Sequence, residues 1–158
     1  MLGNFSFGGD VRVAGAAFPK GQPDEVVPEL QRHGFKTVVN LTEYAHPAAA
    51  AMAEAGIAAV HIPIQDYEAP SPVQMDAVKA IVLDDARCPV LLHCRAGIGR
   101  TGTMLAVAVA ALVGSGKLDA ATVVGDDTVA YVRSLRRGSL EVQSQVDAFK
   151  AWAAQQSS

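Results

Sequence analysis

VLLHCRAGIGRTG, from Val90 to Gly102, is the stretch of sequence that decides the fold of this chain. Its first residues form a short apolar run typical of a buried strand, and the apolar residues from Thr103 to Val113 have the length of a helix. The glycine-bearing loop between them predicts a strand–loop–helix unit. In such a unit, backbone N–H groups and a helix N-terminus point at one place, which makes it an anion-binding site.

Two reactive side chains lie in this loop. Cys94 stands at the mouth of the expected anion site, where the local field favours a thiolate. Arg100 closes the loop with a rigid fork of donors that suits phosphate oxygens. Gly97 and Gly99 let the loop turn its amides inward without Cβ clashes. A thiolate and an anion cradle in one loop predict nucleophilic attack on a bound oxyanion, most naturally a phosphate monoester.

An acid is needed to protonate the leaving oxygen of a phosphate ester. Asp66, in the proline-flanked loop from Pro63 to Pro72, is the best candidate, because loops at the carboxyl ends of neighbouring parallel strands converge on one crevice. The alternative is that Asp66 is an ordinary turn residue.

The run from His93 to Thr101 resembles the signature of the cysteine-dependent protein tyrosine phosphatases: His-Cys, five residues, then Arg-Thr. Weaker matches follow one another along the chain and resemble small atypical dual-specificity phosphatases of the VHZ type. These matches are Asn4-Phe5-Ser6, Val13-Ala14-Gly15, Leu41-Thr42-Glu43, Ile62 to Asp66, and Arg136 with Gly138-Ser139-Leu140-Glu141.

The resemblance implies a role for each signature residue. It makes Cys94 the nucleophile, Arg100 the phosphate and transition-state clamp, and Asp66 the acid and then the base. It also implies that the Thr101 hydroxyl helps to expel the thiolate, and His93 is expected to orient the loop through its ring. The residues that bind the phosphate group would be Arg95, Ala96, Gly97, Ile98, Gly99 and Arg100.

Accessory roles have open alternatives. Gln145 matches a glutamine that orients the hydrolytic water, or it is a solvated helix residue. Glu141 is the rival of Asp66 as the acid, or it complements the dipole of the last helix in its first turn. Arg95 resembles the basic residue of phosphatases that act on inositol phospholipids, or it is a solvated side chain.

Strands alternating with helices predict an α/β fold: a single domain over residues 1–158 with a central, largely parallel sheet of four to five strands flanked by helices. The central strand is expected at Pro89–His93, and Val11 to Ala16 is expected to be an edge strand. Ser71 has Gln74 at the capping-box position of a helix. Ser139 is expected to cap the last helix.

Composition narrows the classes of function. The 158 residues carry a net charge of −3, so nucleic acid is not an expected partner. We expect no signal peptide and no membrane span, since the longest apolar run is far below the ~20 residues of a spanning helix. The two cysteines, Cys88 and Cys94, predict neither a disulfide framework nor a metal site. We therefore expect a cytoplasmic enzyme that needs no cofactor.

The predicted substrate is a phosphorylated protein or a small phosphate ester. Phosphotyrosine is preferred, phosphoserine and phosphothreonine are open, and inositol phosphates or phosphoinositides are the alternative.

A sulfurtransferase typically has four residues, not five, between its cysteine and arginine, and a non-catalytic phosphoprotein-binding module would be expected to lack Cys94 or Arg100. An arsenate reductase needs a resolving cysteine, but Cys88 lies on the order of 20 Å away along an extended strand. The sequence gives no indication of the oligomeric state.

Overall fold

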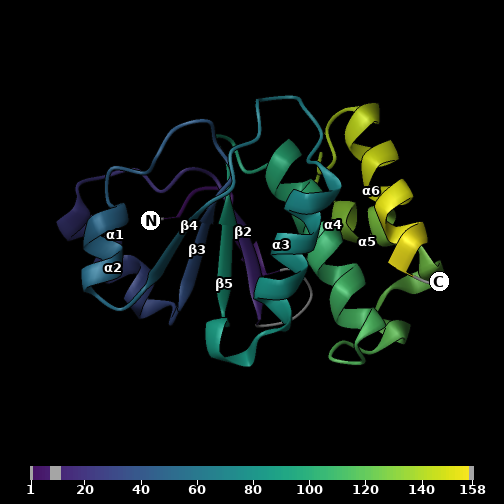
Figure 1. The fold of residues 1–158 in the computed structure, drawn as a ribbon, viewed down its shortest axis with the longest axis horizontal. Coiled ribbons are helices and arrows are strands. Elements are labelled where there is room, and N and C mark those ends of the chain that lie inside the picture. Colours follow the sequence, from purple (N-terminus) through teal and green to yellow (C-terminus); the bar gives the residue numbers. More distant parts are fainter. Residues whose placement is uncertain (1, 8–11, 157–158) are drawn as a thin grey trace.

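One mixed β-sheet lies between two layers of helices in the computed structural model, which describes residues 2–7 and 12–156 (Figure 1). The strand order is β1-β2-β5-β3-β4, and every neighbouring pair is parallel except the antiparallel pair β1–β2. The predicted α/β class and the central position of β5 are therefore confirmed. The strands are β1 (Ser6–Phe7), β2 (Val13–Ala16), β3 (Thr37–Asn40), β4 (Ala58–His61) and β5 (Val90–His93).

Helices cover both faces of the sheet because the middle residues of its inner strands, β3 and β5, are apolar on both faces. Val38 and Leu91 pack on one face against the first two helices, whereas Val39 and Leu92 pack on the other face against the remaining four. The helices are α1 (Pro23–Arg32), α2 (Ala49–Glu54), α3 (Pro72–Leu83), α4 (Gly99–Gly114), α5 (Thr128–Leu135) and α6 (Gln143–Gln156). Short 3₁₀ turns occupy residues 85–87, 120–122 and 124–126.

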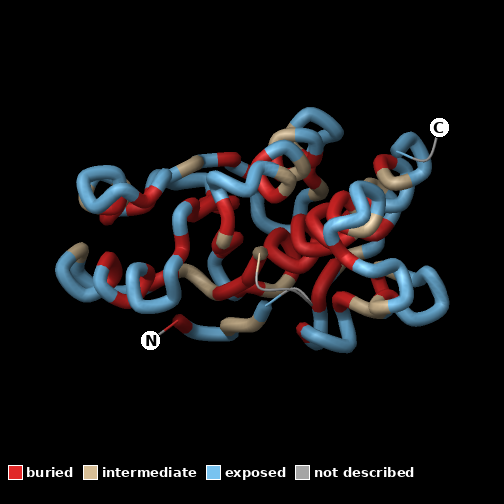
Figure 2. The backbone as a smooth tube through the Cα atoms, turned by 90° about the horizontal axis from the view of Figure 1, so that it is seen from below, coloured by how far each residue is buried: buried red, intermediate tan, exposed pale blue. Residues whose placement is uncertain are grey.

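Helix α4 is the innermost helix of the fold. It contacts β2 and β5 on one side and α3, α5 and α6 on the others, so it is apolar around its whole circumference. Figure 2 shows buried backbone concentrated in this helix and in the strands, with exposed segments around them. Burial on all sides fixes α4, and with it the position of the loop that leads into its N-terminus.

The four parallel strands end at the same level. Ala16, Asn40 and His61 all stand in register with His93 through the β2–β5, β5–β3 and β3–β4 pairings. The connections that follow these strands therefore gather at one edge of the sheet, the upper edge in Figure 1. This is the edge at which an α/β sheet binds its ligands.

Two local predictions were wrong, and one was confirmed. β2 is an inner strand, because β1 pairs with its outer side; Val11 lies outside the described residues. Ser139 does not cap the last helix, which begins at Gln143, since Ser139 is buried beside the backbone of α4. The Ser71–Gln74 capping box is present at the start of α3. Across residues 2–7 and 12–156, no helix is long and apolar enough to cross a membrane.

Candidate active site

The loop between β5 and α4 is held by its backbone carbonyl groups. The carbonyl oxygen of Arg95 accepts a hydrogen bond from the backbone N–H of Phe18, at 3.0 Å. The Asn4 side-chain amide donates to the carbonyl oxygens of Ala96 and Gly97, both at 3.1 Å. Three consecutive carbonyl groups therefore point away from the centre of the loop, toward donors in other parts of the chain.

The backbone N–H groups consequently point toward the centre. In a planar trans peptide, the N–H lies opposite the carbonyl of the preceding residue. Outward carbonyls at residues 95, 96 and 97 thus place the N–H groups of Ala96, Gly97 and Ile98 on the inner side. The Gly97 N–H donates to the Cys94 sulfur at 3.3 Å. The loop is therefore an amide-lined cradle with Cys94, which is 3% exposed, at its base.

The two loop glycines are required for different reasons. Gly97 has φ +75°, and a Cβ there would lie 2.5 Å from the carbonyl carbon of Ala16. Gly99 opens α4, and a Cβ there would lie 3.0 Å from the Glu141 carboxylate and 3.1 Å from the Gln145 side-chain amide. Side chains at these positions would push the loop away from the end of β2 or away from Glu141 and the first turn of α6.

Arg100 is a buried guanidinium, 2% exposed, at the rim of the cradle. Its Nη1 donates to the Glu43 carboxylate and, at 2.8 Å, to the Ile64 carbonyl oxygen. Its Nη2 lies 3.3 Å from Asp66 Oδ1. Nε is buried and has no hydrogen-bond partner in the described part of the chain. Glu43 and Ile64 thus occupy Nη1 and Asp66 lies beside Nη2, whereas Nε has no partner among the described residues and is the donor left for an oxyanion.

Asp66 reaches Arg100 by an indirect route. Its strand, β4, is separated from β5 by β3, so the loop after β4 has to fold back across the sheet edge. The Ile64 N–H donates to the Leu41 carbonyl oxygen at 3.2 Å and so holds the loop over the end of β3. The Asp66 side chain is 48% exposed and accepts the Tyr67 N–H at 3.0 Å. The candidate acid is thus next to the clamp and accessible to a substrate.

The start of α6 and the segment before it bring two further predicted residues to the loop. Gln145 is fully buried, so the interpretation as a solvated helix residue is wrong. Its side chain donates to the Glu68 carbonyl oxygen at 3.2 Å and accepts the Val142 N–H at 3.4 Å. Glu141 is exposed and precedes α6, and its carboxylate lies beside Gly99. Both acid candidates therefore border the cradle, Asp66 beside Arg100 and Glu141 beside Gly99.

His93 and Thr101 are buried on either side of the loop. His93 Nδ1 is 3.5 Å from the Cys94 carbonyl oxygen, a long contact, and its ring packs edge-on against Phe18 and His46. Burial, with a smaller contribution from His46, lowers the pKa of His93 to about 3, so the ring is neutral. The Thr101 hydroxyl is buried and has no hydrogen-bond partner among the described residues.

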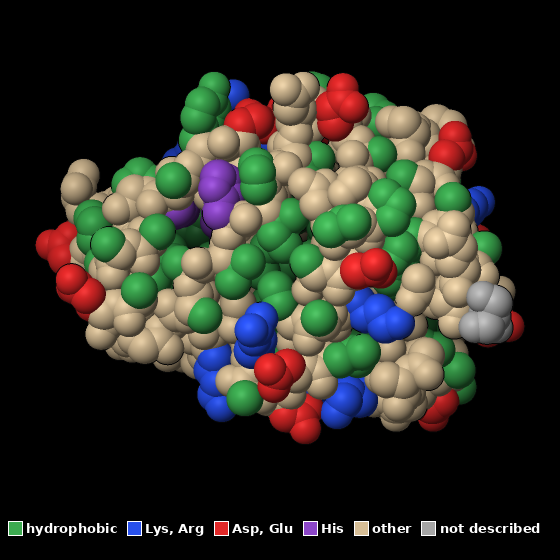
Figure 3. All heavy atoms as spheres, in the orientation of Figure 1, with side chains coloured by type: hydrophobic (Ala, Val, Ile, Leu, Met, Phe, Trp, Pro, Cys, Tyr) green, Lys and Arg blue, Asp and Glu red, His purple; other side chains and the backbone are tan. Residues whose placement is uncertain are grey.

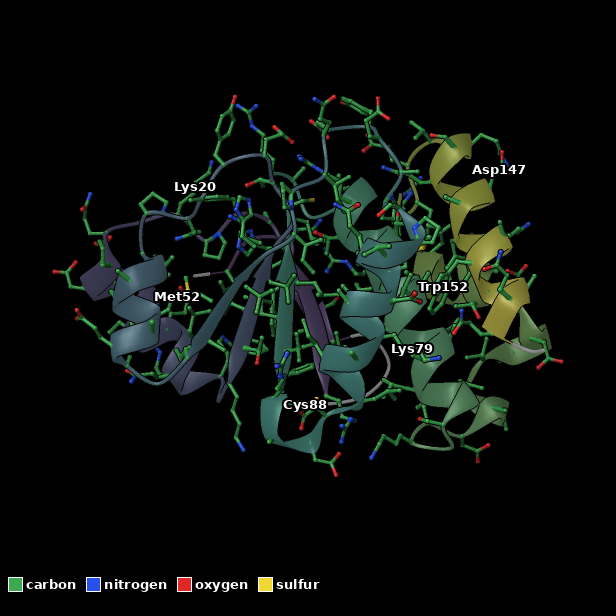
Figure 4. The ribbon with its side chains drawn as sticks, in the orientation of Figure 1. Lys20, Met52, Lys79, Cys88, Asp147 and Trp152 are labelled. Carbon is green, nitrogen blue, oxygen red and sulfur yellow. The ribbon has the colours of Figure 1, made fainter. Side chains whose placement is uncertain are left out.

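A cavity of about 500 Å³ opens beside the cradle. Lys20 lies at the same edge of the sheet as the loop between β5 and α4 (Figure 4), and the exposed Arg95 lines the cavity with it. The remaining lining residues are Phe18, Thr42, Glu43, Tyr44, Ala45, Pro47 and Arg100. On the face drawn in Figure 3, charged side chains of both signs are scattered among apolar and neutral ones. Lys20 and Arg95 thus bring two basic side chains to the cavity beside the loop.

Sequence reasoning missed three contributors to the site. Glu43, Asn4 and Arg136 all contact the loop or its arginine, yet they entered the sequence argument only as weak matches to a family. Nothing in their local sequence indicates chemistry, since each becomes relevant through a contact more than 35 positions away. Residues 2–7 and 12–156 contain no grouping of three or more histidine, cysteine, aspartate or glutamate side chains suited to a metal.

Comparisons with known proteins agree with this geometry. The model of the Tc-R-P family, described as "Polymorphic toxin system, DSP-PTPase phosphatase", matches residues 14–116, more than half of the chain. The structure of Tk-PTP in its active form is 32% identical, with a TM-score of 0.75 over 98% of this chain and 99% of that one. The tyrosine phosphatase OH1 from the Orf virus is 23% identical, with a TM-score of 0.63 over 95% of this chain and 87% of that one, which shows the shared fold.

Two curated relatives are much longer proteins. Protein tyrosine phosphatase domain-containing protein 1 from Bos taurus is 25% identical over 77% of this chain, but the match covers 16% of that protein. Probable NAD kinase 2 of Oryza sativa subsp. japonica is 35% identical over 46% of this chain, and the match covers 8% of that protein. The family match over the strand–loop–helix core, together with Tk-PTP, places this chain in the Tc-R-P family of dual-specificity-type protein tyrosine phosphatases.

Proposed function

We propose that the chain hydrolyses phosphate monoesters, with phosphotyrosine of proteins as its main substrate, through a cysteinyl-phosphate intermediate. The observation that carries this proposal is the loop geometry. The Gly97 N–H donates to the Cys94 sulfur, the carbonyl groups of residues 95, 96 and 97 are bonded on the outer side of the loop, and the buried Nε of Arg100 has no hydrogen-bond partner among the described residues. A bound phosphate monoester would place its phosphorus over the sulfur, with its oxygens on donors that are already oriented.

In the first step, the Cys94 thiolate attacks phosphorus and forms the S–P bond while the P–O bond to the leaving group breaks. Asp66 gives its proton to the departing oxygen, as its exposed position next to Arg100 allows. The equatorial oxygens are held by the loop amides and by the Nε and Nη2 of Arg100. Since phosphate competes with Asp66 for Nη2, substrate binding turns the carboxyl toward the leaving group.

In the second step, water attacks phosphorus, Asp66 accepts its proton, and the S–P bond breaks to release phosphate and the thiolate. The buried Thr101 hydroxyl, next to the loop and without another partner in the described chain, stabilises the departing thiolate. Gln145 is fixed beside Gly99 and orients the water. His93 stays neutral below the loop and supports it by packing, and Glu141 is a bystander or an alternative acid.

The same site favours a second candidate substrate class. Lys20 and Arg95 line the cavity next to Arg100, so a substrate with a further phosphate would find two more cations there. Inositol phosphates and phosphoinositides have this chemistry. The narrower VHZ-like assignment, a cytoplasmic location that keeps the thiolate reduced, and independence from metal are further parts of the proposal.

An aryl phosphate assay tests the proposed function, with chelator present throughout. Turnover that the Cys94→Ser variant lacks would support the proposal, whereas thiosulfate turnover would indicate a sulfurtransferase. Binding of a phosphopeptide without turnover would indicate a recognition module. A panel of phosphotyrosine, phosphoserine and phosphothreonine peptides beside inositol phosphates then decides the substrate class. Loss of activity on chelation that a divalent ion restores would contradict the metal-free mechanism.

A further inference from the structure

We propose that Arg136 and Asn4 are positioning residues that hold the loop carbonyls outward, and that the resulting inward amides and the Arg136 charge keep Cys94 as a thiolate. The inference rests on the proposed function only in that Cys94 is the reacting group. Neither residue touches the inner side of the loop. Both act on its outer side, from segments before β2 and after α5.

Arg136 joins three separate parts of the molecule. Its Nη1 donates to the Ser6 hydroxyl at 2.7 Å and to the Gly15 carbonyl oxygen at 3.0 Å, and its Nη2 donates to the Gly97 carbonyl oxygen. The absence of a side chain at residue 15 leaves room for the guanidinium beside β2, since a Cβ there would lie 3.2 Å from Arg136 Cζ. The side chain thus connects the end of α5 to the loop across the strand.

The charge of Arg136 is poorly compensated by carboxylates. The residue is 5% exposed, and no ion pair of the described residues includes it. Burial lowers the pKa of Arg136, while the charge of Cys94 acts in the opposite direction. The guanidinium lies behind the loop whose Gly97 N–H donates to the Cys94 sulfur, so its positive charge acts in favour of the thiolate. Burying a cation with no carboxylate beside it costs free energy, unless another negative charge such as that of Cys94 offsets the cost.

Asn4 contributes the neighbouring contact. Its amide donates to both the Ala96 and Gly97 carbonyl oxygens, and its backbone has φ 48°, a region that asparagine tolerates well. The Gly97 carbonyl therefore accepts from Asn4 and Arg136 together. Reversal of that peptide would lose both bonds and turn the Ile98 N–H away from the substrate.

Alkylation of Cys94 by iodoacetamide across pH tests the proposal, because it reports the thiolate without any need for turnover. The experiment uses the full chain with Cys88→Ser, so that only one cysteine reacts. In Arg136→Met, which keeps the length of the side chain, we expect the alkylation rate at pH 6 to fall about 10-fold and the pH midpoint to rise by about one unit. Asn4→Gly, which tolerates the positive φ, should reduce the rate about 3-fold.

Arg137→Met is the matched control, because Arg137 is the adjacent, exposed arginine and its loss changes the net charge equally. This variant should alkylate like the parent chain. A purely structural role for Arg136 would lower the melting temperature and leave the alkylation profile of the folded protein unchanged, which would overturn the proposal. If Arg136→Met does not fold, the alkylation profiles of Arg136→Lys and Asn4→Gly across pH test the proposal in its place. Failure of the proposed function would appear separately, as a parent chain that alkylates normally but hydrolyses no aryl phosphate.

Discussion

The two cysteines lie at opposite ends of the same strand and have opposite hydrogen-bond environments. Cys94 follows the carboxyl end of β5, where its sulfur accepts the Gly97 N–H at 3.3 Å. Cys88 precedes the amino end, at the lower edge in Figure 4, where its sulfur lies 3.3 Å from the Val82 carbonyl oxygen. Both are buried and neither is in a disulfide. Burial alone therefore does not distinguish them.

The difference follows from the polarity of the strand ends. An N–H that points at sulfur stabilises a thiolate, whereas a carbonyl oxygen can only accept from a thiol S–H. The carboxyl end of a parallel strand leads into a loop and a helix N-terminus, so donors gather there. The end of β5 that a cysteine occupies thus determines whether its sulfur meets an N–H donor or a carbonyl oxygen.

The largest effect we expect is the difference in kcat between serine substitutions at Cys94 and at Cys88. Cys94→Ser should lower kcat for an aryl phosphate by about 10⁴-fold or more, because a hydroxyl is a far weaker nucleophile at neutral pH. Cys88→Ser should leave kcat unchanged and cost about 1 kcal/mol of unfolding free energy, since the hydroxyl keeps a donor toward Val82. Steady-state kinetics and urea unfolding measure both. If the Cys94→Ser variant retained a tenth of the activity, Cys94 would not be the nucleophile.

Arg100→Lys tests whether the guanidinium next to the Cys94 loop acts on phosphate through its geometry or only through its charge. Lysine keeps the positive charge but loses the fork, so kcat should fall by about 10²–10³-fold, with a smaller change in KM. Melting temperatures would show whether loss of the contacts to Ile64 and Glu43 also destabilises the fold. Near-normal kcat would mean that charge at the rim is sufficient.

Asp66→Asn should have an effect that depends on the leaving group. Phenyl phosphate and phosphotyrosine should slow by about 10²-fold and p-nitrophenyl phosphate far less, because an acidic phenol departs without protonation. The alkaline side of the kcat/KM pH profile should also flatten. Glu141→Gln is the control, as it removes the other carboxylate that borders the loop, beside Gly99. If Glu141→Gln shows this dependence and Asp66→Asn does not, the two residues exchange roles.

The last prediction concerns the pH dependence of stability and leaves activity at neutral pH unchanged. His93 has its pKa lowered from 6.5 to about 3 by burial, so the folded state excludes its protonated form. The stabilisation that the neutral His93 ring gives the folded state is therefore complete above pH 6.5. It is lost as pH falls from 6.5 toward 3. The free energy of unfolding should decrease by about 1.4 kcal/mol per pH unit in that window. His93→Gln should reduce this slope, whereas a substitution of the exposed His33 should not. An unchanged slope in His93→Gln would show that the proton binds elsewhere.

Sequence reasoning went furthest where local spacing determines geometry. The strand–loop–helix unit, the clamp Arg100 and the central place of β5 all follow from apolar runs and glycine positions within 25 residues. Asp66 was found by the general rule for parallel strands, although β4 is not adjacent to β5. The edge position of β2 was predicted wrongly because strand order depends on which partner, β1, covers its outer side.

By itself, the sequence determined the inner side of the site: a thiol, two glycines and an arginine whose spacing allows only one kind of loop. The outer side was decided by tertiary structure alone. Asn4, Glu43 and Arg136 are polar residues with no local pattern, and they reach the loop only when β1, β3 and α5 pack around β5 and α4. The physical reason is that the backbone amides of a loop are aimed by their own short chain, whereas the carbonyls behind them need donors from distant segments.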